Sequence, residues 1–225
     1  MHTFQLPSGI EVELREMTGA EEELLTNQRL IRTGDAVNQV LKNCVLRLGE
    51  NAKPGMKEIL DLLSGDRLFI LVKLRQISLG EEVDLELVCP NTACREANLT
   101  SVNLEELKLT PYGKDREFTF KLPGSNRKVK FMHLDGNMEK RLASLKEPSI
   151  TSAMLMRIVE IDGKPPTRKL MAEMSLRDRS ALRQEMARVD AGIDTVVEVD
   201  CESCGARIRT RLEAEPGFLF PGVRL

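Results

Sequence analysis

The chain has 225 residues, of which 41% are hydrophobic and 30% charged, a composition typical of a protein that folds around an apolar core. Its 33 Lys and Arg against 35 Asp and Glu give a formal net charge of −2, which provides no overall attraction to nucleic acid or anionic lipid. No segment approaches the roughly 18 consecutive apolar residues of a membrane span. The first residues, MHTFQLPSGIEVEL, lack the pattern of a secretory signal, so we expect cytosolic synthesis.

The chain opens with an alternating segment that recurs after its midpoint. TFQLPSGIEVELREMTG (residues 3–19) is echoed by TFKLPGSNRKVKFMHLDG (residues 119–136), at an offset of 116 that becomes 117 after the turn. Alternating strands on either side of a Pro, Gly and Ser turn predict a β-hairpin in both places. A helix start follows each hairpin: Thr18 with Glu21 forms a predicted capping box, and Asp135 is the corresponding N-cap.

Helical periodicity follows each hairpin. Residues 36–48 match residues 149–161 at an offset of 113, and both segments place apolar residues three and four positions apart. A second predicted helix, residues 64–76, matches residues 176–188 at an offset of 112. The first copy of this second helix is much more apolar. We therefore expect it to lie in a core or against a partner, and its counterpart to lie more in water.

Two cysteine segments close the repeated units at the same offset of 112. The predicted strands at residues 83–89 and 195–201 each lead into a close pair of cysteines. Four matches in the same order predict two diverged copies of one unit, module one at residues 1–112 and module two at residues 115–225. The expected fold class is α+β, with a β-hairpin, helices and a cysteine knuckle in each module.

The cysteines themselves indicate a metal site. Cys89 and Cys94 form one pair, and Cys201 and Cys204 form the other. Cys44 stands alone in an apolar helical segment, where we expect it to be a small core residue. Disulfides are rare in a reducing cytosol, and cysteine pairs two to four residues apart are typical zinc ligands. The alternative is that the pairs are ordinary buried cysteines, or that the metal has been lost.

Four thiolates would complete the tetrahedral coordination of one Zn²⁺ and leave no position for water or substrate. Such an ion is structural, and it would fasten the end of module one to the end of module two. His133 could be imagined as a general base, but no nucleophile or carboxylate is tied to it in the sequence, so a plain surface or interface histidine is favoured. We therefore expect a protein that is not an enzyme.

Arg207, Arg209 and Arg211 alternate along the strand that leaves the second knuckle, so they share one face. They could contact phosphate or an acidic partner, as in zinc ribbons that bind nucleic acid or transcription machinery. The interpretation we favour is a solvated edge strand protected by charge.

Two apolar segments are candidates for binding other proteins. Leu68, Phe69 and Leu71 belong to the apolar helix of module one, and Phe218 and Phe220 lie between prolines near the C-terminus. The C-terminal segment either packs back on the core, which we favour, or docks on a partner.

The sequence also resembles a known family. The hairpin with LPSG, the following VELREMTG, the long segment LLSGDRLFILVKLRQISLGEEVDLELVCP, the C-x-x-C-G knuckle and the Phe-Pro terminus are together similar to baseplate hub assembly chaperones of contractile-tailed, T-even-like bacteriophages. The resemblance covers most of the chain, although the first knuckle is more widely spaced than the family pattern.

This resemblance implies a protein that helps to assemble the baseplate hub or wedge through contacts with other phage tail or baseplate proteins. It implies residence in the host cytoplasm during assembly and leaves open whether the protein stays in the virion baseplate. Neither nucleic acid nor a membrane span is expected, and the oligomeric state is left open.

Overall fold

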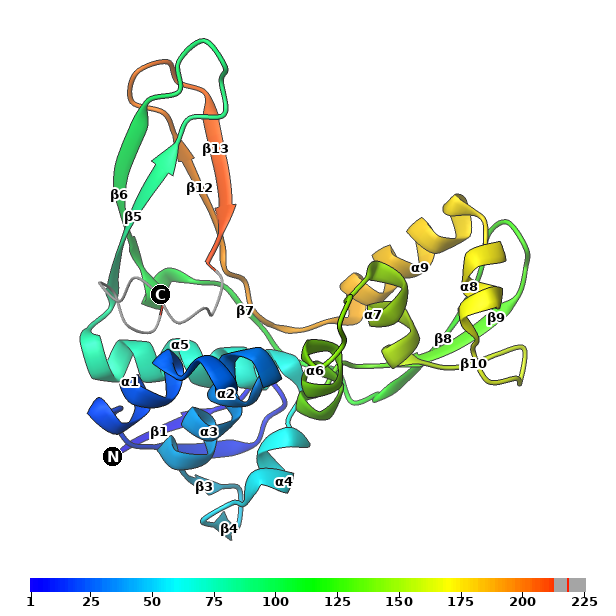
Figure 1. Ribbon diagram of the computed structural model, residues 1–225, viewed down its shortest axis with the longest axis horizontal. Coiled ribbons are helices and arrows are strands. Elements are labelled where there is room, and N and C mark those ends of the chain that lie inside the picture. The colour runs from blue at the N-terminus through cyan, green and yellow to red at the C-terminus, as the bar shows by residue number, and fades with distance from the viewer. Residues whose placement is uncertain (213–217, 219–225) are drawn as a thin grey trace.

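The computed structural model describes residues 1–212 and residue 218, which form two lobes and an arm (Figure 1). Lobe one comprises residues 1–81 and lobe two residues 117–191. The arm combines residues 82–103 with residues 196–211, and it projects away from lobe one while lobe two extends to the side (Figure 1). Because the chain runs from lobe one through half of the arm to lobe two and then back to the arm, its two halves are interlocked.

Lobe one is a four-stranded antiparallel sheet, ordered β1-β2-β3-β4, that packs against helices. The predicted hairpin is confirmed: β1 pairs with β2, and the alternation puts Val12 and Leu14 fully inside the core. The elements of this lobe are β1 (His2–Gln5), β2 (Glu11–Leu14), α1 (Gly19–Thr26), α2 (Gln28–Thr33), α3 (Asp35–Cys44), β3 (Val45–Leu48), β4 (Asn51–Ala52), α4 (Met56–Leu60) and α5 (Ser64–Leu79).

Helix α5 is the central helix of this lobe, as its apolar sequence predicted. Ile70, Val72 and Leu74 are fully buried, together with neighbours on nearly every side of the helix. By contrast, α9, the predicted counterpart in lobe two, buries chiefly Leu182 and Met186. The expectation that the first helix lies in a core and the second lies more in water is confirmed.

Lobe two contains a three-stranded sheet, ordered β10-β9-β8, and a smaller core centred on Phe131, Ile161, Met171 and Leu182. Its elements are β8 (Glu117–Lys121), β9 (Lys128–Met132), α6 (Gly136–Ala143), α7 (Ile150–Arg157), β10 (Ile158–Ile161), α8 (Arg168–Glu173) and α9 (Leu176–Val189).

Each lobe has a third strand where the sequence pattern predicted a continuous helix. Residues 36–48 and 149–161 were expected to be helical throughout, but α3 ends at Cys44 and α7 ends at Arg157. The last four residues, VLRL and IVEI, form β3 and β10, which pair with β2 and β9. The prediction was wrong there because these short apolar runs fit either period, and the free edge of each hairpin supplies partners for the backbone.

The predicted helix starts are present in both lobes. The Glu21 carboxylate accepts a hydrogen bond from the Thr18 N–H at 2.9 Å, which is the reciprocal half of a capping box. The Asp135 carboxylate accepts one from the Met138 N–H at 2.8 Å. Each hairpin is therefore followed directly by a capped helix, α1 in lobe one and α6 in lobe two.

The arm consists of two antiparallel hairpins that run beside each other (Figure 1). Its strands are β5 (Glu82–Val88), β6 (Ala97–Asn103), β12 (Val196–Asp200) and β13 (Arg207–Arg211). At the base of the arm, the short helix η1 (Leu104–Glu106) leads to β7 (Leu109–Thr110), which pairs with β11 (Gly192–Ile193). Val83, Val197 and Leu212 join the core cluster of lobe one. Residues from both halves of the sequence therefore contribute to that core.

No helix of the described residues combines the length and the apolar character needed to cross a lipid bilayer.

Candidate metal centre

The four predicted ligands meet at the tip of the arm, far from both lobes (Figure 1). The sulfur atoms of Cys89, Cys94, Cys201 and Cys204 all lie within 4.8 Å of one another. The Sγ atoms of Cys89 and Cys204 are 3.6 Å apart, and those of Cys94 and Cys201 are 3.9 Å apart. A tetrahedron with Zn–S bonds of about 2.3 Å has edges of about 3.8 Å, so the cluster has the size that one zinc ion requires.

The two cysteine turns have the same backbone construction although their spacing differs. The Cys89 N–H donates to the Glu96 carbonyl and the Cys201 N–H donates to the Ala206 carbonyl, both at 2.9 Å. The residue after the second cysteine of each pair is left-handed, Arg95 with φ 55° and Gly205 with φ 67°. Glycine favours this conformation in the tighter turn, and an arginine adopts it in the wider turn.

Backbone N–H groups are directed at the sulfur atoms. Burial raises the pKa of the Cys201 thiol, but hydrogen bonds from the N–H groups of Cys204 and Ser203 outweigh it and lower that pKa to about 6. Burial raises the pKa of Cys89 to about 12. The protein thus favours a thiolate at one position, and a bound cation would supply the charge that lets the remaining thiols ionise.

Asn98 connects the two turns and was missed by the sequence reading. It is 5% exposed, accepts a hydrogen bond from the Glu202 N–H at 3.0 Å and donates one to the Glu96 carbonyl at 3.0 Å. An amide at an inward-facing strand position was the available signal, but its partner on the second turn lies more than 100 positions away in the chain.

The tip has little apolar packing of its own. Cys89, Cys201 and Ile208 form a small buried cluster that is separate from the cores of the lobes. Two hairpins held by so few side chains need another source of stability, and a structural zinc provides this in domains of similar size. The donor set and the packing therefore fit a metal that holds the tip together.

The residues predicted to bind partners have different positions. Phe69 and Leu71 are only 5% and 4% exposed, so their side chains are covered by this chain itself and form part of the core of lobe one. Leu68 is half-buried and lines a cavity of about 540 Å³ between the lobes. Phe218 packs against the core of lobe one, and Phe220 lies outside the described residues.

The two remaining candidates have core positions. His133 is 4% exposed, with its ring centroid 4.7 Å from that of Tyr112 and 4.9 Å from that of Phe118. Of the expected surface or interface position, the surface is wrong, because the rings of Tyr112 and Phe118 pack against His133 inside this chain. Cys44 is fully buried, which raises the pKa of its thiol to about 12 and confirms it as a core residue.

Two of the three arginines of β13 are paired with the neighbouring strand. Arg207 lies 3.5 Å from the Asp200 carboxylate, and Arg209 lies 3.3 Å from that of Glu198. Both arginine side chains are 69% exposed, so these pairs are screened by solvent. The geometry matches the solvated, charge-protected strand that we favoured.

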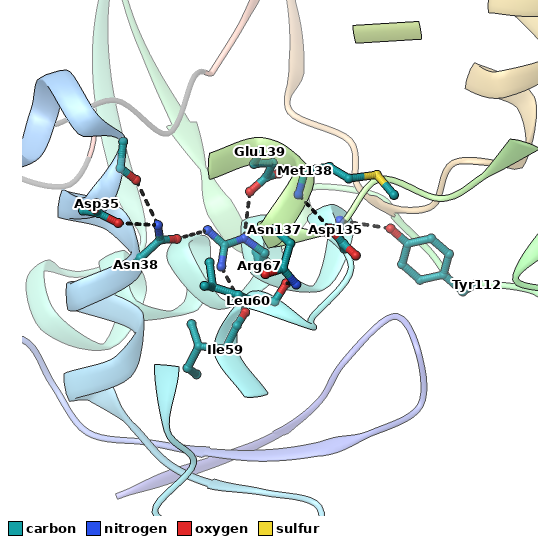
Figure 2. Close-up of polar contacts among 12 residues, drawn as sticks. Asp35, Asn38, Ile59, Leu60, Arg67, Tyr112, Asp135, Asn137, Met138 and Glu139 are labelled. Carbon is teal, nitrogen blue, oxygen red and sulfur yellow. Dashed lines mark hydrogen bonds and ion pairs between the residues drawn. The ribbon is translucent and has the colours of Figure 1, made fainter. Parts of the chain in front are cut away.

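A buried arginine joins the two lobes. The Arg67 guanidinium, on α5, donates to Glu139 at 2.7 Å, to the Asn38 side-chain oxygen at 2.6 Å and to the Ile59 carbonyl at 3.1 Å (Figure 2). Glu139 comes from α6 of lobe two, whereas the other three residues belong to lobe one. An arginine in an apolar helix was a visible signal for buried pairing, but the sequence does not reveal which distant residue pairs with it.

The start of α6 adds backbone contacts to this joint. The Gly136 N–H donates to the Leu62 carbonyl at 3.1 Å, and the Ser64 N–H donates to the Leu134 carbonyl at 2.9 Å. A Cβ atom on Gly136 would lie 2.7 Å from the Arg67 guanidinium, so only glycine allows α6 to approach this closely. The joint and the arm tip are thus two separate places where the halves of the chain are held together.

Comparison with known proteins gives one match. The sequence model of a family described as T4 bacteriophage base plate protein matches residues 1–215, which is nearly the whole chain. No curated protein and no solved structure matches. The match agrees with the resemblance seen in the hairpin, the α5 segment and the knuckles, and the chain belongs to the T4 bacteriophage base plate protein family.

Proposed function

We propose that this chain is a non-catalytic baseplate hub or wedge protein, or a chaperone for their assembly, in a contractile phage tail. The proposal is supported by membership of the base plate protein family over residues 1–215. The protein acts through contacts with other tail proteins, and it is stabilised by a structural Zn²⁺ bound by Cys89, Cys94, Cys201 and Cys204.

The observation that carries the zinc assignment is the convergence of four sulfur atoms from two distant segments within 4.8 Å. Four thiolates fill a tetrahedral site, so the ion would have no open position for a substrate or an activated water. Its role would be to clamp the two arm hairpins, and with them both halves of the chain.

We also infer that the chain arose by duplication. The pairing order β1-β2-β3 corresponds to β8-β9-β10, and a capped helix follows each hairpin. The chain then continues through α3 or α7 and α5 or α9 to one of the two cysteine hairpins. The zinc site would then join equivalent ends of two related modules.

The metal assignment is tested by elemental analysis of the purified full-length chain. We expect one zinc per chain in the native protein and in Ser203→Ala, an exposed control in the same turn. Cys201→Ser should lose the zinc, and the free energy of unfolding should fall by more than about 4 kcal/mol, because metal loss is among the most destabilising changes. Absence of metal from the native chain, or equal stability of the two variants, would refute the clamp.

The assembly role is tested by removing the gene from the phage that encodes it and examining the particles by electron microscopy. Loss of complete baseplates, restored by the native chain supplied in trans, is the expected result. Mass spectrometry of purified virions then separates a retained component from a chaperone that departs. Normal tails without the protein, or co-purification with polymerase subunits, would contradict the proposal.

A further inference from the structure

Lobe two has an apolar groove between three helices. The groove has a volume of about 290 Å³, and Ile150 at its edge is 60% exposed. It is open on one side, so it is a surface feature and not a part of the core. The residues that line it come from α6, α7, α9 and the residues next to these helices, and include Ala153, Met154, Arg157, Arg183, Met186 and Asp190.

The corresponding helices of lobe one border the cavity of about 540 Å³, whose other side is formed by α6 of lobe two. By the offsets of the proposed duplication, Ala153 corresponds to Val40, Met154 to Leu41 and Arg183 to Leu71. Val40 and Leu41 are fully buried and Leu71, which borders this cavity, is 4% exposed. In lobe two, Ala153 is smaller than Val40 and the exposed Arg183 carries a charge, whereas Met154 is nearly as buried as Leu41. This comparison rests on the proposed duplication.

Charge distinguishes the surroundings of the groove from the rest of the molecule. Residues 117–191 contain 15 Lys and Arg against 10 Asp and Glu, a formal charge of +5, while the other residues contain 18 against 25, a charge of −7. The near-neutral total conceals this division. A basic lobe attracts acidic partners and steers their approach.

One cation at the edge of the groove is free to select such a partner. Arg157 is occupied by Asp190, to which it donates at 2.6 and 2.9 Å. Arg183 is exposed, and in the part of the chain that the structure describes it makes no ion pair or side-chain hydrogen bond. A carboxylate of a bound protein could reach it without displacing an existing partner.

We propose that this groove binds an acidic amphipathic helix of another protein, with apolar side chains inserted between the helices and a carboxylate paired with Arg183. An apolar trough between helices is a recurrent site for amphipathic helices. Met154 and Met186 are only 3% and 4% exposed and lie beneath the groove, where flexible methionine side chains can adapt to the inserted residues. The lining contains no aromatic residue on which a base could stack, which favours protein over single-stranded nucleic acid.

The test measures fluorescence anisotropy of a labelled, designed 18-residue helical peptide with leucines on one face and glutamates beside them. We expect the full-length chain to bind this peptide at least tenfold more tightly than a version with lysines in place of the glutamates. Arg183→Glu should weaken binding at least tenfold. Arg177→Glu, which changes an exposed arginine of the same helix outside the groove, should change it less than twofold.

A second pair of variants tests the groove itself. Ala153→Phe should fill it and abolish peptide binding, while Ala172→Phe on exposed α8 should not. Equal effects of the two arginine variants, equal affinity for both peptides or no binding would overturn the proposal. Stronger binding of an oligo(dT) probe, or self-association through the groove in size-exclusion chromatography, would overturn it in favour of nucleic acid or a second copy. Zinc content measured on the same preparations shows separately whether the proposed clamp is intact.

Discussion

The two lobes have the same order of strand pairing but differ in what their helices cover. In lobe one, α1, α3 and α5 close over the sheet and bury a large continuous core to which the arm also contributes. In lobe two, a smaller core lies beside an open groove, and the surface is basic. Under the proposed duplication and the proposed groove function, one scaffold serves as the stable base of the molecule in lobe one and as a binding surface in lobe two.

The two lobes and the two halves of the chain are connected at separate places. Lobe two is attached to lobe one through the Arg67 joint, and the halves of the chain meet again at the cysteine cluster. The stability of lobe two should therefore depend on contacts outside its own core, whereas lobe one should depend mainly on internal packing.

The largest expected difference between the lobes concerns one pair of corresponding positions. Leu41→Ala should reduce the free energy of unfolding by about 4 kcal/mol, because the fully buried side chain leaves a cavity that its neighbours cannot fill. Met154→Ala should cost about 2 kcal/mol: this side chain is only 3% exposed, but it borders the open groove, where the neighbours can relax. Urea denaturation measures both values. Equal costs would show that the two cores are similarly closed.

The joint between the lobes is tested by a change of somewhat smaller effect. Arg67→Ala should cost about 3 kcal/mol, because it leaves Glu139, Asn38 and a buried carbonyl without their partner. Hydrogen exchange should show loss of protection in α6 first. Lys140→Ala is the matched control: its ion pair with Asp35 also joins α6 to lobe one, but the lysine side chain is 42% exposed, so the cost should be below about 1 kcal/mol. Similar costs for Arg67→Ala and Lys140→Ala would show that the buried contacts of Arg67 are not what stabilises the joint.

The parts of the fold that could be predicted are those set by neighbouring residues. Alternation and a Gly or Pro turn define both hairpins, Thr18 and Asp135 mark helix starts, and the apolar composition of α5 indicates its central position. Strands β3 and β10 were missed because a four-residue apolar run after a helix is compatible with either period, and only the partner strand decides between them.

The cysteine cluster was predictable because zinc chemistry restricts both the residue type and the spacing, so two distant pairs could be matched to each other. No comparable restriction links Arg67 to Glu139 or Asn98 to Glu202, since many polar residues could have been partners. The inward position of His133 likewise depends on the packing of Tyr112 and Phe118 around it.

The smallest predicted difference is in the acid sensitivity of the lobes. Glu21 is buried, which by itself raises its pKa, but hydrogen bonds from Arg15, Thr18 and Asn43 outweigh burial and lower that pKa to about 2. Its folded-state pKa lies below the unfolded value of 4.5, so its contribution to stability is complete above pH 4.5 and is lost as the pH falls toward 2. This contribution is on the order of 2 kcal/mol.

The corresponding position in lobe two is Met138, which has no charge to titrate. Lobe one should therefore lose this contribution around α1 and α3 in acid. The acid response of lobe two comes from other carboxylates with lowered pKa values, such as Asp178, which accepts hydrogen bonds from the Gly124 and Ser125 N–H groups. Hydrogen exchange of α1 and α3 followed from pH 5 to pH 3 isolates the contribution of Glu21. Glu21→Gln should remove the dependence from α1 and α3, whereas Glu22→Gln, an exposed neighbour, should leave it unchanged. If Glu22→Gln flattened the profile equally, the acid response would arise from the general negative charge around lobe one, and the difference between the lobes would be one of surface charge instead of a single buried carboxylate.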